Sequence, residues 1–255
     1  MAARILAIHA HPDDLEILAC GTLALLARRG HRLSMVTMTP GDKGTDVYSP
    51  EEISAIRLAE AASAARLIGA EYYCADFRDF AIFGDDLSRK RIVEVLRKFQ
   101  PELVLTAAPV DYLSDHEVTS DLVRDACFGA PMPNYHTIDE NPAPVLPRIP
   151  HLYFVDPVGG VDRDNRIMFA DFYVNIESTF ETKRAMLAEH RSQREWLLRH
   201  HGMDDYMISM ENWTRERGRL AGVTYAEGFR LYKGHPYPQS PRLEELLGPD
   251  VVIRA

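Results

Sequence analysis

The chain has 255 residues, of which 46% are hydrophobic and 26% are charged, and this balance excludes fibrous and wholly disordered proteins. The 38 acidic residues outnumber the 29 basic residues, so the formal net charge is −9. Such a chain lacks the overall basic field that holds a phosphate backbone, and we therefore expect no nucleic-acid partner.

The cysteines and the apolar segments indicate the cellular compartment of the protein. Three cysteines lie far apart without a C-x-x-C pair, which supports neither a disulfide framework nor a cysteine zinc site. The N-terminus lacks the apolar core of a signal peptide, and no apolar run is long enough for a membrane span. These patterns predict a cytoplasmic protein without a membrane span.

Strands and helices alternate through the first half of the chain. Short apolar runs predict the strands, and apolar residues at helical spacing predict the helices. Ser49, Pro50 and Glu52 form the pattern of a capping box at the start of one helix. In chain order we expect strand Arg4–His9, helix Leu15–Arg29, strand Arg32–Met38, helix Pro50–Ile68, strand Glu71–Cys74, helix Leu87–Phe99, strand Leu103–Ala107 and helix 114–128. This order is typical of an α/β fold with a parallel sheet.

The second half is less regular. Prolines recur at about 129–150, and we favour a surface excursion that covers a site over a plain linker. The elements expected after it are strands His151–Val155 and Phe172–Asn175, helices Phe180–His201 and Asp204–Ala221, and an extended C-terminal tail at about 230–255. We expect a single domain over residues 1–255.

Polar residues gather where three predicted strands end. They are found in segments 9–14, 39–44 and 111–116, which follow the first, second and fourth strands. Because ligands collect at the carboxyl ends of strands in open parallel sheets, we expect these segments to share one edge.

Two interpretations apply to these segments. Asp13 followed by Glu16, and Ser114 followed by Glu117, fit helix caps. Capping does not explain why histidines lie beside the aspartates in two separate segments. His11, Asp14 and His116 form a carboxylate and two-imidazole set that suits a divalent ion and leaves positions open for water. Asp13 would then be free to act as a base on that water.

At these residues the sequence resembles the PIG-L/LmbE-like zinc deacetylases. The likeness begins with Ala10-His11-Pro12-Asp13-Asp14-Leu15-Glu16. Further similar segments are 39–44, the helix with Arg57 and Glu60, Asp115-His116, 190–193 and 226–230, so the resemblance covers most of the chain. That family removes acetyl groups from N-acetylglucosamine-type sugars on lipid, thiol-precursor or glycopeptide-antibiotic substrates. The resemblance implies a Rossmann-like three-layer sandwich with a mostly parallel central sheet.

The resemblance also implies roles for individual residues. It implies one Zn²⁺ per chain held by His11, Asp14 and His116, with Asp13 as the general base and Arg57 as a substrate contact. Further candidates for substrate contact are Asp42 and Tyr112, and candidates for supporting positions around the metal are Asp115, His9 and His190. For His190, a structural histidine with satisfied hydrogen bonds is an equally good interpretation.

One departure keeps alternatives open. Members of the family often carry a histidine three residues before the second metal histidine, and this chain has Leu113 there. The alternatives are a zinc hydratase of an unsaturated diacid or another hydrolase, an Fe(II) oxygenase with a two-histidine, one-carboxylate site, and a non-catalytic binding protein. The expected partner is a small-molecule or glycoconjugate substrate, and a homo-oligomer remains open.

Overall fold

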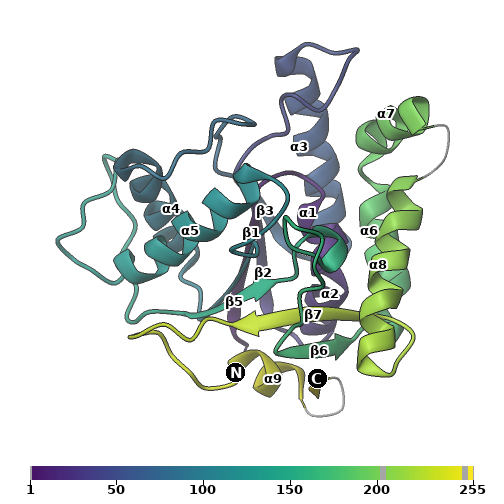
Figure 1. Cartoon of the computed structure of the whole chain (residues 1–255). Helices are drawn as coiled ribbons and strands as arrows, with labels where there is room; N and C mark the ends of the chain where they lie inside the picture. Colours follow the sequence, from purple (N-terminus) through teal and green to yellow (C-terminus); the bar gives the residue numbers. More distant parts are fainter. Residues whose placement is uncertain (1, 202–204, 249–251, 255) are drawn as a thin grey trace.

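One mixed β-sheet with helices on both faces organises the molecule (Figure 1). The computed structural model describes residues 2–201, 205–248 and 252–254. The strands run in the order β3-β2-β1-β4-β5-β7-β6-β8. Their bounds are β1 Arg4–His9, β2 Arg32–Thr37, β3 Glu71–Cys74, β4 Leu103–Thr106, β5 His151–Val155, β6 Phe172–Asn175, β7 Ala226–Leu231 and β8 Val252–Arg254.

The strand directions confirm the predicted fold class. Strands β3, β2, β1, β4 and β5 pair in parallel, whereas β7, β6 and β8 pair antiparallel. The carboxyl ends of β1, β2 and β4 therefore meet at one edge, as the polar segments predicted.

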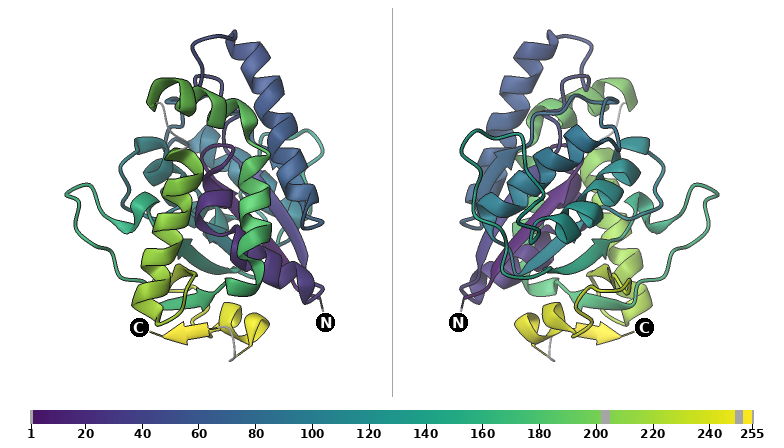
Figure 2. Two further views of the ribbon diagram at one scale, coloured as in Figure 1. Left: turned by 90° about the vertical axis from the view of Figure 1, so that its right-hand side faces the viewer. Right: turned by 90° about the vertical axis from the view of Figure 1, so that its left-hand side faces the viewer.

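The helices form the two outer layers (Figure 2). Their bounds are α1 Asp14–Leu18, α2 Cys20–Arg28, α3 Pro50–Arg66, α4 Asp86–Phe99, α5 Ser114–Gly129, α6 Phe180–Ala188, α7 Arg191–His201, α8 Asp205–Ala221 and α9 Arg242–Leu247. Successive residues of β1 face opposite sides, so Ile5 and Ala7 join the core under α2 and α6 while Leu6 and Ile8 join the core under α4 and α5. The predicted three-layer sandwich is thus confirmed.

Two predicted helices are each divided in the structure. Ala19, at φ −142° and ψ −8°, separates α1 from α2 where one helix was expected. Likewise, the helix expected from Phe180 is interrupted after Ala188, and α7 begins at Arg191. The apolar spacing continues through the break at Ala19, so it carried no sign of that break. The capping box at Ser49 and Glu52 is confirmed. Asp204, the expected start of the next helix, lies outside the described residues.

A buried glutamate accounts for the break before α2. Glu227 on β7 accepts hydrogen bonds from the backbone N–H groups of Gly21 (2.9 Å) and Thr22 (2.7 Å). Lys183 on α6 places its Nζ 2.7 Å from the same carboxylate. A negative charge at a helix N-terminus satisfies its unpaired amides and complements the helix dipole. Glu227 therefore ties β7, α2 and α6 together inside the molecule.

The C-terminal prediction of an extended tail needs correction. The segment 230–255 contains α9 and β8, and its first residues belong to β7. Helix α9 forms because Leu243 and Leu247, one turn apart, are both buried in the core. Strand β7 pairs with both β5 and β6 and so joins the parallel and antiparallel parts of the sheet.

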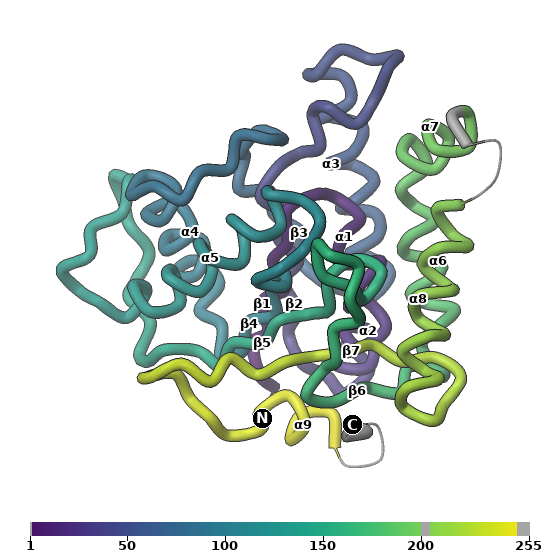
Figure 3. Tube along the Cα trace, in the orientation of Figure 1, coloured from purple at the N-terminus to yellow at the C-terminus, as the bar shows by residue number. Residues whose placement is uncertain are grey.

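The proline-rich segment does not cover the edge where the polar segments meet. It packs along α4, on the side of the molecule away from α1 (Figure 3). Glu94 on α4 accepts from Ala143 N–H (2.7 Å) and from the Thr137 hydroxyl (2.6 Å), and Arg97 donates to Met132 O (2.7 Å). These hydrogen bonds overturn the expectation of a cover. Within the described part of the chain, no helix combines the length and apolarity needed to cross a membrane.

We predict that Glu227→Ala strongly destabilises the fold. The substitution leaves two amides and the Lys183 ammonium buried without their partner, which costs about 3–5 kcal/mol for a buried pair. Urea unfolding followed by circular dichroism measures the change. Glu216→Ala is the matched control, because the Glu216–Arg219 pair on α8 is exposed. Equal unfolding midpoints for Glu227→Ala and the control would contradict this account.

Candidate metal centre and active site

One carboxylate oxygen lies at the centre of the cluster at the sheet edge. The Oδ2 atom of Asp14 is 2.7 Å from His9 Nδ1, 3.4 Å from His11 Nδ1 and 3.4 Å from His116 Nε2. It also accepts a hydrogen bond from the His11 backbone N–H at 2.8 Å. His9 and His11 leave the end of β1, and His116 comes from the first turn of α5. The sheet thus brings together residues that are distant in the sequence, as predicted.

Two further carboxylates hold the outer nitrogens of two of these rings. Asp115 Oδ2 lies 3.1 Å from His11 Nε2, and Asp111 Oδ2 lies 3.0 Å from His116 Nδ1. A carboxylate on the far nitrogen of an imidazole is the usual support of a metal-binding histidine, because it fixes the tautomer and the ring orientation. The inner nitrogens, His11 Nδ1 and His116 Nε2, are thereby directed toward Asp14. Asp115 was predicted in such a supporting position.

The cluster can hold a metal ion, with one difference from the predicted ligand set. Among the described residues, the group whose ligand atoms all lie within 4.8 Å of one another is His9, Asp14 and His116. The Nε2 atoms of His9 and His116 are buried without a hydrogen-bond partner. Asp14 and His116 belong to both sets. His9, expected in a supporting position, is thus part of the cluster, and the choice of His11 as the third ligand stays a prediction.

The charges of the cluster depend on one another. Burial raises the pKa of Asp14, but His116 and His9 outweigh it, so the pKa lies well below its usual value. Burial lowers the pKa of His11, but hydrogen bonds to Asp115 and Asp14 outweigh it and raise the pKa to about 10. Carboxylates and imidazoles that stabilise one another's charges in this way also suit a divalent cation, which replaces the protons on the imidazoles.

Asp13 faces a different environment from its neighbour Asp14. Its side chain is 11% exposed, and its φ of 102° is in the left-handed region that residues other than glycine rarely adopt. Oδ2 accepts from the Tyr206 hydroxyl at 2.7 Å and from Arg57 Nη2 at 3.3 Å. Burial raises the pKa of Asp13, although Arg57 opposes the shift. A carboxylate with raised proton affinity beside residues that can hold a metal ion is suited to act as a base.

The helix-cap interpretation of these aspartates is not supported. Asp13 occupies the N-cap position of α1 but makes no side-chain capping hydrogen bond. Helix α5 starts at Ser114 with Leu113 as N-cap, again without a side-chain cap. Glu117, expected to complete that cap, instead accepts from the Asp111 N–H at 2.9 Å.

Arg57 lies beneath Asp13 rather than at the opening of the site. Its side chain is 5% exposed, and Nη2 donates to Pro12 O at 2.7 Å as well as to Asp13. A Cβ atom added at Gly41, where φ is +77°, would collide with the guanidinium group. The glycine therefore makes room for Arg57. These contacts favour a role for Arg57 in orienting Asp13 over the direct substrate contact that was predicted.

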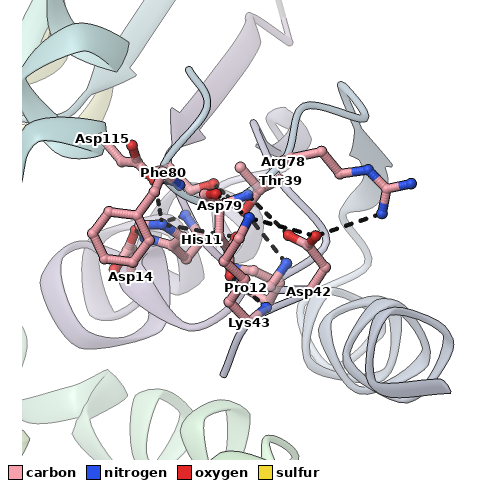
Figure 4. A network of polar contacts seen from close by, with 12 residues as sticks. His11, Pro12, Asp14, Thr39, Asp42, Lys43, Arg78, Asp79, Phe80 and Asp115 are labelled. Carbon is pink, nitrogen blue, oxygen red and sulfur yellow. Dashed lines mark hydrogen bonds and ion pairs between the residues drawn. The ribbon is translucent and has the colours of Figure 1, made fainter. Parts of the chain in front are cut away.

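Asp42 and Asp79 fix the loops around His11 (Figure 4). Asp42 Oδ1 accepts from the Asp79 N–H at 2.9 Å, and Asp79 Oδ2 accepts from the Lys43 N–H at 3.0 Å. Asp79 Oδ1 is buried without a hydrogen-bond partner and lies 4.0 Å from His11 Nε2. Asp79, rather than the predicted Asp42, is therefore the aspartate of this pair that faces the cluster.

Tyr112 is exposed to solvent, whereas His190 is buried. Tyr112 is 67% exposed, and its ring centroid lies 5.4 Å from that of His116. Its contact with a substrate stays a prediction. His190 is fully buried with Nε2 3.3 Å from Glu16 Oε1, but neither ring nitrogen makes a hydrogen bond within the described part of the chain, so the interpretation as a histidine with satisfied hydrogen bonds is not supported.

Three residues of the site were not predicted from the sequence. Asp111 could have been suspected, because it lies in the same short segment as His116. Asp79 and Tyr206 gave no such signal, since their places depend on a loop after β3 and on a helix from the last quarter of the chain.

Comparison with known proteins agrees with this geometry. Residues 6–127 match the family described as PIG-L, GlcNAc-PI de-N-acetylase. The chain is 28% identical over 240 residues to diacetylchitobiose deacetylase of Thermococcus kodakarensis, covering 91% of this chain and 84% of that protein. It is 26% identical over 190 residues to 4-oxalmesaconate hydratase of Pseudomonas putida, covering 71% and 70%.

Solved structures show the same fold. N,N'-diacetylchitobiose deacetylase from Pyrococcus horikoshii has a TM-score of 0.75 at 27% identity, covering 93% of this chain and 88% of that chain. GalB, the 4-carboxy-2-hydroxymuconate hydratase from Pseudomonas putida, has a TM-score of 0.74 at 22% identity, covering 94% and 100%.

We predict that Asp14→Ala, His116→Ala and His11→Ala each weaken Zn²⁺ binding by more than about 100-fold, whereas His9→Ala weakens it by about tenfold. A metal ligand contributes a coordination bond. A residue that only orients the ligands typically changes the metal affinity by 10–100-fold. Competition with a chromophoric chelator measures the affinities. A larger loss in His9→Ala than in His11→Ala would show that His9 is the third ligand.

Proposed function

We propose that this chain, whose residues 6–127 match the PIG-L family, is a zinc-dependent hydrolase. It would remove an acetyl group from the amine of an N-acetylglucosamine-type sugar or glycoconjugate. The observation that carries the proposal is the contrast between Asp13 and Asp14. Asp14 faces imidazole nitrogens, whereas Asp13 accepts from Tyr206 and Arg57. Adjacent carboxylates in such different environments are typical of a site where one binds a metal and the other transfers protons.

His11, Asp14 and His116 would hold the ion. A carboxylate with two imidazoles is a donor set that suits Zn²⁺ and leaves coordination positions open. When bound, Zn²⁺ lowers the pKa of its water to about 7 and polarises the acetyl carbonyl. Asp115 and Asp111 keep the two histidine rings in the orientation that this binding needs.

Asp13 carries the proton between reactants. Among the hydrogen bonds of the described residues, those to its side chain end on Oδ2, which leaves Oδ1 to take a proton from the attacking water. As the oxygen of that water bonds to the acetyl carbon, the carbon–nitrogen bond breaks. Asp13 then returns the proton to the departing nitrogen, and the products are acetate and the free amine.

Leu113 stands where members of the family often carry a histidine that serves the leaving group. Asp115 and His190 are unsuited to replace it, because Asp115 is engaged by His11 and Phe80 and His190 is buried beside Glu16. Asp13 therefore serves as both base and acid. Tyr112 is the exposed polar side chain best placed beside His116 to contact the acetamido group.

Hydration of an unsaturated diacid is the second candidate function. Two observations favour it: Leu113 in place of the family histidine, and the similarity to the hydratases described above. Acetate release from N-acetylglucosamine, diacetylchitobiose and related glycosides, measured beside hydration of 4-oxalmesaconate, separates the two reactions. Hydration without acetate release would overturn the proposed deacetylation.

We predict that Asp13→Asn keeps bound zinc but lowers acetate release by about 10²–10⁴-fold, the usual contribution of a general base. Asparagine preserves the size of the side chain and cannot accept the proton. Asp121→Asn, on the exposed side of α5, serves as the control variant. An unchanged rate in Asp13→Asn, with metal content verified, would exclude this role.

We predict that Tyr206→Phe lowers kcat about tenfold with little effect on zinc content, because one of the two donors that orient Asp13 is lost. Steady-state kinetics and metal analysis measure both quantities. Tyr225→Phe is the matched control, since its hydroxyl donates to a different carboxylate, Glu211, at 3.3 Å. If both variants behave like the unmodified protein, the Tyr206 hydrogen bond has no part in turnover.

A further inference from the structure

Two aromatic residues donate backbone hydrogen bonds to the carboxylates that contact His11 and His116. The Phe80 N–H donates to Asp115 Oδ2 at 2.7 Å, the oxygen that also lies 3.1 Å from His11 Nε2. The Tyr112 N–H donates to Asp111 Oδ1 at 2.6 Å, and the other oxygen of Asp111 holds His116. Each aromatic residue therefore lies beside one of the two histidines that flank Asp14.

Both rings are presented to solvent rather than to the core. Phe80 is 65% exposed and Tyr112 is 67% exposed. The Phe80 ring stands free of the hydrogen-bond network that holds its backbone (Figure 4). The Tyr112 ring meets His116 edge to face, with an interplanar angle of 85°. Exposed aromatic rings next to a polar cluster are typical of a binding surface.

The backbone of Phe80 is held in a disfavoured conformation. Its φ is 60°, in the left-handed region that a bulky residue rarely adopts. The neighbouring contacts impose this conformation, since Asp79 is fixed on both sides by Asp42 and Lys43 and the Phe80 N–H is fixed by Asp115. When neighbouring contacts hold a residue in a strained conformation at a site, the strain indicates a function for the side chain of that residue.

We propose that Phe80 and Tyr112 form an aromatic platform that binds the pyranose ring of the substrate. The inference rests on the proposed function and adds the residues that select a cyclic sugar. The apolar C–H face of a pyranose packs on an aromatic face, while its acetamido group reaches Asp13 and the metal cluster. Selection then depends on the Phe80 ring, which an acyclic acetamide does not contact.

The kinetic test compares a sugar with an acyclic amide. Phe80→Ala and Tyr112→Ala are expected to lower kcat/KM for methyl N-acetylglucosaminide about tenfold or more, mainly through KM. For Phe80→Ala, kcat/KM for N-acetylethanolamine should stay within about twofold, as expected when uniform binding of the ring is lost. Phe80→Tyr should preserve the KM for the sugar, and Phe80→Leu should behave like Phe80→Ala.

Phe83→Ala is the matched control, since Phe83 is 61% exposed on the same loop and makes no described contact with the cluster. Equal losses for the sugar and the acyclic amide would overturn the platform. So would a loss in Phe83→Ala as large as that in Phe80→Ala, or an unchanged KM for the sugar in Phe80→Ala.

A binding measurement separates this inference from the proposed function. Calorimetric titration of zinc-loaded Asp13→Asn protein with methyl N-acetylglucosaminide gives the Kd with and without Phe80→Ala. Weaker binding in the double variant, together with no acetate release by the unmodified enzyme, would support the platform and overturn the deacetylation. Acetate release by the unmodified enzyme, together with unchanged binding in the double variant, would support the deacetylation and overturn the platform. No binding of the sugar at all would overturn both.

Discussion

A buried carboxylate surrounded by nitrogen atoms is the constraint on which the rest of the site depends. Asp14 loses its hydration when it is enclosed at the sheet edge, and this loss is compensated only if His9, His11 and His116 all approach it. Those rings need Asp111 and Asp115 to fix them, and the loops carrying these aspartates are fixed in turn. The parallel sheet supplies the geometry by ending β1 and β4 side by side.

The backbone turn at Asp13 separates two functions within two consecutive residues. Because Asp13 adopts a left-handed φ, its side chain points away from that of Asp14 and reaches donors on α3 and α8. Burial then raises the pKa of Asp13, whereas the imidazoles lower that of Asp14. Opposite pKa shifts in neighbouring carboxylates favour the ionised form of Asp14 and raise the proton affinity of Asp13.

Local sequence patterns predicted those features of the structure that depend on residue spacing and on the order of the elements. The alternation of strands and helices, the cap at Ser49 and the meeting of His11, Asp14 and His116 at one edge follow from residue spacing and topology. The break at Ala19 could not be predicted, because it depends on Glu227 from the far end of the chain. Tyr206 and Asp79 escaped prediction for the same reason, as did the burial of Arg57 beside Asp13, which depends on tertiary contacts.

The contacts of Glu227 and Tyr206 have a consequence for how the molecule is made on the ribosome. Residues 6–127 contain the aspartates and histidines of the site, yet α2 and Asp13 receive essential hydrogen-bond partners from residues beyond 200. A nascent chain that has emerged only through β5 therefore carries the histidines and aspartates of the cluster without the groups that complete their surroundings. The surroundings of the site are thus completed late in synthesis, and the first half of the chain alone lacks these contacts.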